Sequence, residues 1–132
     1  MVLVDANVLL DIITSDPKWF EWSADRMERA LAQGLAINPV IYAELSAGFR
    51  KEEELDAALG LAELERLPIP YQAAFRAARA FVEYRSRGGD RRSPLPDFFI
   101  GAHAETAGLT LLTRDAARYR TYFPKLRLIT PE

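Results

Sequence analysis

Short apolar runs alternate with longer amphipathic segments along the whole chain. The first run, Met1 to Val4, is continuously apolar, which is typical of a strand buried on both faces. The segments between the runs are long enough for helices, and this alternation favours a parallel sheet with helices on both faces. The expected strands cover 1–4, 35–37, 67–69, 109–112 and 126–129.

The helical segments carry apolar residues at helical spacing, and several have recognisable ends. Asn38 and Pro39 form a strong start signal, because Asn caps free N–H groups and Pro is tolerated at the first helical position. Gly34 and Gly108 mark helix ends. In the helix that ends at 87, Ala74, Phe75, Ala78, Phe81 and Val82 are expected to face inward. The predicted helices cover 8–13, 18–33, 39–48, 51–66, 71–87, 97–107 and 116–122.

These elements predict a three-layer α/β/α sandwich with a parallel sheet of four to five strands in the order 3-2-1-4-5. In such sheets ligands bind beyond the carboxyl ends of the strands, where the strand order reverses. With this order, the strands 1–4 and 109–112 are neighbours at the reversal. Asp5 and Asp115, which follow these two strands, are therefore expected to lie side by side.

Length and composition fit one domain over residues 1–132. The chain is 49% hydrophobic and 27% charged, which gives enough apolar residues for a real core. It has no cysteine, which excludes disulfides, zinc-thiolate sites and thiol catalysis, and suits a reducing cytosol. No apolar run approaches the roughly 20 residues of a membrane helix, and no leader precedes the first strand. We expect a cytoplasmic protein that is not associated with a membrane.

The distribution of charge qualifies the net charge of −2. Four of the 19 acids are candidate metal ligands, namely Asp5, Glu44, Asp97 and Asp115. The other 15 acids stand against 17 Lys and Arg, and the basic residues concentrate in the second half of the chain. A polyanion can bind this basic side, although a solvated surface explains many of the same charges. The candidate phosphate contacts are Arg85, Arg87, Arg91, Arg92 and Arg114.

Four carboxylates, those of Asp5, Glu44, Asp97 and Asp115, are expected at the same edge of the sheet. Each alone is explained as a helix cap or an exposed helix residue. Together they would repel one another in a poorly solvated cleft unless a cation lay between them. Oxygen ligands without histidine or cysteine suit Mg²⁺ or Mn²⁺, and such an ion favours phosphodiester hydrolysis that leaves a 5′-phosphate and a 3′-hydroxyl.

Two polar residues lie two positions from candidate ligands. Asn7 follows Asp5 and Thr113 precedes Asp115, so each can hydrogen-bond a carboxylate or a metal-bound water, although both also fit ordinary turn and strand-end roles. His103, the single histidine, is expected to be structural. An aromatic group near the start of the second predicted helix consists of Trp19, Phe20 and Trp22. These side chains either pack in the core or bind a partner.

Four segments in order carry a resemblance to a known family. VLVDANVLLD at 2–11, NPVIYAEL at 38–45, LPDFFIGAHA at 95–104 and LLTRD at 111–115 resemble the motifs of PIN-domain nucleases. The chain is most similar to the VapC-type toxins of bacterial and archaeal toxin-antitoxin pairs.

This resemblance implies an Mg²⁺- or Mn²⁺-dependent endoribonuclease that cuts structured RNA and arrests growth. It maps Asp5, Glu44, Asp97 and Asp115 onto the family's acidic quartet. It also implies a homodimer and a cognate antitoxin, which lies in the groove and often places a basic side chain in the acidic site.

Other function classes fit the motifs less well. A metal-dependent phosphatase of the aspartyl-nucleophile type needs a second aspartate two residues after the first, where this chain has Asn7. A receiver domain needs an adjacent acid pair and a strand-end lysine. A noncatalytic protein-binding module with a PIN-like fold remains the main alternative. No glycine-rich phosphate-binding motif is present.

Overall fold

A five-stranded parallel sheet organises the protein. The computed structural model describes residues 1–60, 62–89 and 95–131. The strands lie in the order β3-β2-β1-β4-β5, which confirms the predicted topology. Their bounds are β1 Val2–Val4, β2 Leu35–Ile37, β3 Leu64–Arg66, β4 Thr110–Leu112 and β5 Arg127–Ile129.

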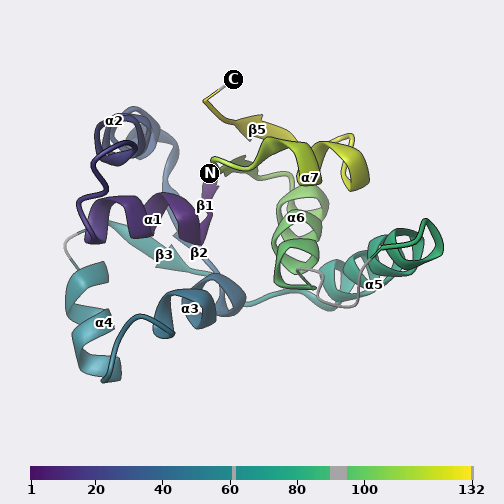
Figure 1. Ribbon diagram of the computed structural model, residues 1–132, viewed down its shortest axis with the longest axis horizontal. Helices are drawn as coiled ribbons and strands as arrows, with labels where there is room; N and C mark the ends of the chain where they lie inside the picture. Colours follow the sequence, from purple (N-terminus) through teal and green to yellow (C-terminus); the bar gives the residue numbers. More distant parts are fainter. Residues whose placement is uncertain (61, 90–94, 132) are drawn as a thin grey trace.

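Helices cover the sheet in two groups. Figure 1 shows α1 to α4 on one side and α5 to α7 on the other, as right-handed crossovers require for this strand order. Within the described residues, none of the helices has the length and apolar character of a membrane span. The helices are α1 Ala6–Ile13, α2 Phe20–Ala30, the 3₁₀ turn η1 Leu31–Gln33, α3 Pro39–Ser46, α4 Glu52–Leu59, α5 Tyr71–Ser86, α6 Leu95–Ala107 and α7 Ala116–Tyr122.

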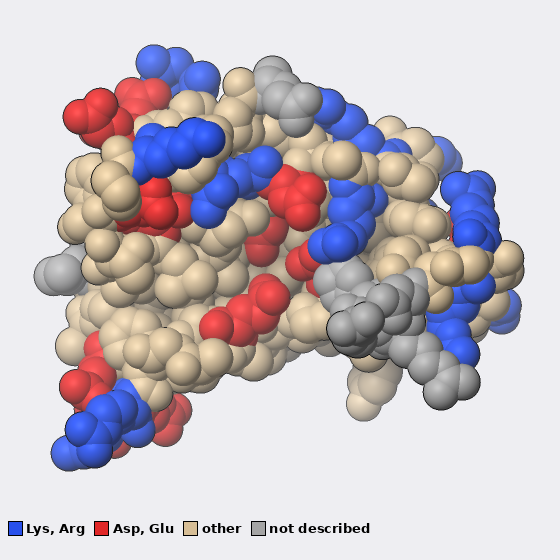
Figure 2. Space-filling model, viewed as in Figure 1, with Lys and Arg blue, Asp and Glu red and all other residues tan. Residues whose placement is uncertain are grey.

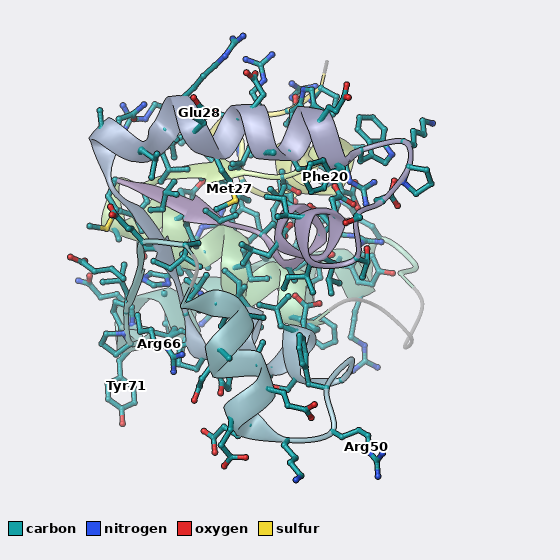
Figure 3. All side chains as sticks on the ribbon, turned by 90° about the vertical axis from the view of Figure 1, so that its left-hand side faces the viewer. Phe20, Met27, Glu28, Arg50, Arg66 and Tyr71 are labelled. Atoms are coloured by element: carbon teal, nitrogen blue, oxygen red, sulfur yellow. The ribbon has the colours of Figure 1, made fainter. Side chains whose placement is uncertain are left out.

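The core lies between the central strands and the two helical layers. All three residues of β1 are fully buried, which explains their continuous apolar run. Met27 of α2 points toward the sheet, whereas Tyr71 and Arg50 project outward (Figure 3). Burial of each large aliphatic side chain contributes about 1.5–3 kcal/mol, so this core fixes the ends of β1 and β4.

The third strand lies earlier in the chain than the sequence predicts. The predicted helix over 51–66 is confirmed only as far as Leu59, where α4 ends with Gly60 as its C-cap, and the predicted strand over 67–69 is wrong. Leu64 pairs with Leu35 and Arg66 with Ile37 in parallel register. β3 is an edge strand with half-buried and exposed residues, so it has no apolar run that would mark it in the sequence.

The inward face of α5 also differs from the prediction. Its buried residues are Ala73, Ala77 and Ala80, while Phe75 and Val82 are 64% and 59% exposed. These small side chains let α5 pack closely on α6, and Phe75 and Val82 of α5 face the solvent instead. The predicted inward stripe is therefore wrong for Phe75, Ala78 and Val82, although Phe81 packs partly against the core.

Candidate functional site

A cleft of about 250 Å³ opens at the carboxyl ends of β1 and β4, next to α3 and α6. All four candidate carboxylates line it, so the structure brings together side chains that are far apart in the sequence. Figure 2 shows acidic side chains gathered near the middle of one face, with basic side chains beside them. The lining residues are Asp5, Ala6, Asn7, Leu10, Glu44, Asp97 and Asp115.

Asp5 is the most firmly held of the four. It ends β1 and caps α1, where its Oδ1 accepts a hydrogen bond from the Ala6 N–H at 2.8 Å. Its Oδ2 accepts from the Thr113 hydroxyl at 2.8 Å and from the Tyr119 hydroxyl at 3.0 Å. The side chain is buried, so these bonds fix the carboxylate at the base of the cleft.

Thr113 and Asn7 join the ends of β1 and β4. The Asn7 side-chain amide donates to Thr113 Oγ1 at 3.3 Å, and the backbone N–H of Asp115 donates to the same oxygen at 3.1 Å. The backbone N–H of Arg114 donates to Asn7 Oδ1 at 3.2 Å. Thr113 thus contacts Asp5 directly, and Asn7 supports it through Thr113.

Asp97 lies in the first turn of α6, which begins at Leu95, two residues earlier than predicted. Its Oδ2 lies 2.6 Å from Arg118 Nη1, and its Oδ1 lies 3.3 Å from the Tyr119 hydroxyl. Arg118 Nη1 also lies 3.8 Å from Asp115 Oδ2.

The sequence reasoning missed both Arg118 and Tyr119. The signal was their position three and four residues after Asp115 in a short helix, where side chains share a face with the acid.

Asp115 and Glu44 have few partners for their charge. Asp115 occupies the N-cap position of α7, yet its side chain makes no capping bond and is 50% exposed. Glu44 projects from α3, and its Oε1 is buried without a hydrogen-bond partner among the described residues. An unpartnered buried carboxylate oxygen is costly, so the cleft is short of positive charge.

The pKa values express this imbalance. Burial raises the pKa of Asp5 to about 6, although Thr113 opposes the shift by hydrogen bonding. Burial, reinforced by the charges of Asp5 and Asp97, raises the pKa of Glu44 to about 7. Burial also raises the pKa of Asp97, while Arg118 acts to lower it. A cation in the cleft would favour the ionised form of all three.

The cleft fits a hard divalent cation by its chemistry. In the described part of the chain, no three Asp, Glu or His side chains are arranged as a ready-made cage for an ion, so the carboxylates share one cleft without closing on one point. The possible ligands are all oxygens, and the unpartnered Glu44 Oε1 is available to one. These features suit Mg²⁺ or Mn²⁺ after a small adjustment of the side chains.

The predicted phosphate contacts separate into distinct groups. Arg114 Nε and Nη2 lie 2.7 and 3.0 Å from the carboxylate of buried Asp11, so this arginine forms an ion pair, and its role in RNA binding stays a prediction. Arg85 and Arg87 are exposed at the end of α5. Arg91 and Arg92 lie outside the described residues.

Of the remaining candidates, His103 packs inside the protein, whereas the aromatic group is partly exposed. His103 is buried, and its Nδ1 lies 3.0 Å from the Asn38 side-chain amide, while burial lowers its pKa. Trp19 and Trp22 meet edge to face at 6.1 Å and are half-buried, whereas Phe20 is 38% exposed.

Comparison with known proteins gives a consistent result. The family model described as PIN domain matches residues 2–124. No curated protein matches the sequence.

Solved structures share the fold. A chain of VapBC2 from Rickettsia felis, bound to a DNA fragment from its promoter, is 22% identical with a TM-score of 0.78, and the match covers 100% of both chains. DNA-bound VapBC from Salmonella typhimurium gives 23% identity and a TM-score of 0.74 over 98% of this chain and 96% of that one. FitAcB from Neisseria gonorrhoeae is 19% identical, with a TM-score of 0.71, and the match covers 99% of this chain and 98% of that one.

Proposed function

Because the chain belongs to the PIN domain family, we propose that it is an Mg²⁺- or Mn²⁺-dependent endoribonuclease and the toxin of a type II toxin-antitoxin pair. One observation carries the proposal: four carboxylates, from α3, α6 and the N-caps of α1 and α7, line a single cleft with too little positive charge. We take residues 1–132 as one nuclease domain that acts in the cytoplasm.

Each residue of the cleft has a defined part in this proposal. Asp5 and Asp97 would hold the ion, and Glu44 and Asp115 would complete its oxygen ligands or bind its water. Thr113 keeps Asp5 oriented through the 2.8 Å hydrogen bond, and Asn7 keeps Thr113 in place. A bound divalent ion would polarise the scissile phosphate and lower the pKa of a water molecule.

The RNA backbone would lie along the basic side of the cleft. Arg85 in the last turn of α5 and Arg87 at its C-cap are exposed. Arg87 pairs with Glu83 at 2.7 Å, and such a surface pair is weak enough to exchange for a phosphate. Arg91 and Arg92 belong to the same proposal on sequence grounds. These contacts bind phosphates without reading bases.

Two protein partners follow from the proposed class. The relatives were crystallised as VapBC and FitAcB assemblies, which supports an antitoxin as the partner here. An apolar cleft beside Glu44 is the surface we assign to a homodimer, since Leu95 is 41% exposed there. Its lining residues are Pro39, Val40, Ala43, Glu44, Leu95, Pro96 and Phe99.

A cleavage assay tests the nuclease directly. The purified protein should cut structured RNA with Mg²⁺ or Mn²⁺, lose this activity in EDTA, and leave 5′-phosphate and 3′-hydroxyl ends. Asp97→Asn should reduce the rate at least 10²-fold with an unchanged circular dichroism spectrum, because a ligand charge is lost while the shape is kept. Full activity in EDTA, or in Asp97→Asn, would contradict the metal mechanism.

Expression in a host cell tests the toxin. The wild type alone should arrest growth, and Asp97→Asn should not. Co-expression of the neighbouring open reading frame should restore growth of cells with the wild type. Equal toxicity of the wild type and the variant would remove the toxin assignment while leaving the in vitro nuclease intact.

A further inference from the structure

We propose that Arg118 is a built-in counter-ion of the acidic cleft. It neutralises Asp97 in the metal-free protein and has to leave Asp97 before a divalent ion can bind, so it sets the metal affinity. This inference rests on the proposed function, because it concerns the same metal site.

The contacts of Arg118 place its charge among the candidate ligands. The residue lies on α7, and its Nη1 is 2.6 Å from Asp97 Oδ2 on α6 and 3.8 Å from Asp115 Oδ2. One guanidinium therefore serves two of the four carboxylates. The Asp97 side chain is 17% exposed, so this is a partly desolvated ion pair and stronger than an ordinary surface pair.

Both oxygens of Asp97 are engaged in this arrangement. Oδ2 accepts from Arg118, and Oδ1 lies 3.3 Å from the Tyr119 hydroxyl. A divalent ion that binds Asp97 can use the second lone pair of either oxygen, but the negative charge of this carboxylate is already shared with the two donors. It would also be repelled by a guanidinium held in contact with its own ligand.

Arg118 is the partner that is able to move. Tyr119 is 1% exposed and its hydroxyl is also bonded to Asp5, so it is fixed by the core. The Arg118 side chain is 38% exposed and can swing into solvent at the edge of the cleft. Metal binding and release of Arg118 are thus two sides of one exchange at Asp97.

Calorimetric titration with Mn²⁺ tests the exchange at fixed pH and ionic strength. Arg118→Gln should bind Mn²⁺ about five- to tenfold more tightly than the wild type, because no ion pair has to be broken. Arg120→Gln is the matched control, since it removes the same charge from an exposed position on the same helix, and it should stay within about twofold of the wild type.

Thermal unfolding gives a second reading of the same exchange. Without metal, Arg118→Gln should melt at a lower temperature than the wild type. Saturating Mn²⁺ should raise the melting temperature of Arg118→Gln by more than it raises that of the wild type. Should Arg118→Gln fail to fold, Arg118→Lys takes its place, with a Mn²⁺ affinity expected above that of the wild type because the shorter chain holds Asp97 less well.

The outcomes separate the inference from the proposed function. Equal or weaker Mn²⁺ binding by the Arg118 variant, while the wild type binds Mn²⁺ and cleaves RNA, would overturn the inference alone. An equal gain in Arg120→Gln would also overturn it, because a general charge effect would then suffice. Absence of Mn²⁺ binding in every variant would overturn the proposed function and the inference together.

Discussion

At the scale of single residues, the site is defined by carboxylates whose burial disfavours their charged form. Asp5 accepts three hydrogen bonds and is still shifted toward its protonated form by burial. Glu44 has a buried oxygen with no partner among the described residues. In the metal-free protein these groups reduce the stability of the fold, which is typical of a site that has a function to perform.

Glu44→Gln tests this cost. The variant should raise the free energy of unfolding of the metal-free protein by about 1 kcal/mol, a value reduced because the side chain is partly solvated. The reason is that a half-buried charge near Asp5 and Asp97 is removed. Chemical denaturation in EDTA measures it, with Glu28→Gln on the exposed face of α2 as the control. A less stable Glu44→Gln protein would contradict the account.

The raised pKa values also predict a pH dependence. The ordinary pKa values of Asp5 and Glu44 are 3.8 and 4.5, and the folded protein raises them to about 6 and about 7. The folded state therefore holds more protons than the unfolded state in this window, and these two groups make the metal-free protein less stable as pH rises from about 4 to about 7.

The difference in unfolding free energy between Asp5→Asn and the wild type isolates this effect from other carboxylates. It should grow in favour of the variant as pH rises from about 4 to about 6 and then level off. Saturating Mn²⁺ should reduce it, because the ion stabilises the ionised wild type. A difference that stays constant with pH would show that Asp5 titrates normally.

At the scale of elements, the packing of α7 on α6 brings Arg118 and Tyr119 to the acids. Gly101 of α6 makes this approach possible, because a Cβ at that position would lie 2.6 Å from the Phe123 ring and 3.1 Å from the Tyr119 ring. Gly101 does not line the cleft, but its lack of a side chain lets α7 place Arg118 and Tyr119 beside the acids.

Gly101→Ala should lower the free energy of unfolding by up to about 2 kcal/mol. Overpacking costs about 1–3 kcal/mol, and the better helix propensity of Ala offsets about 1 kcal/mol of it. RNA cleavage should fall as well, because Tyr119 is displaced. Gly48→Ala is the control, since the added Cβ meets its nearest neighbour at an ordinary 3.7 Å. Equal stability of the two variants would contradict this view of the α6–α7 contact.

The sequence was sufficient for the elements with strong local signals. Buried β1, the Asn38–Pro39 start of α3 and the strand order followed from apolar runs, cap residues and topology. β3 was missed because an edge strand has no apolar signature. The buried face of α5 was misjudged because alanines, and not the larger side chains, face α6. The spacing of Arg118 from Asp115 is a local signal, but the contact of Arg118 with Asp97 depends on how α7 packs on α6, which no local pattern encodes.

At the scale of the whole molecule, the acidic and apolar clefts share Glu44. An interface on the apolar cleft would therefore border the proposed catalytic site. Leu95→Glu should convert the proposed homodimer into a monomer in size-exclusion chromatography with light scattering, because a charge would be buried at the contact. Leu31→Glu, at another exposed apolar position, should remain dimeric. A monomeric wild type, or a dimeric Leu95→Glu, would contradict the assignment.

The central claim is that carboxylates from separate elements meet around one hard cation. Anomalous diffraction from crystals soaked in Mn²⁺ measures this directly. The account predicts a Mn²⁺ peak about 2.0–2.3 Å from oxygens of Asp5 and Asp97, with Arg118 turned away from Asp97. A cleft without a peak at saturating Mn²⁺, or a peak bound elsewhere on the protein, would contradict it.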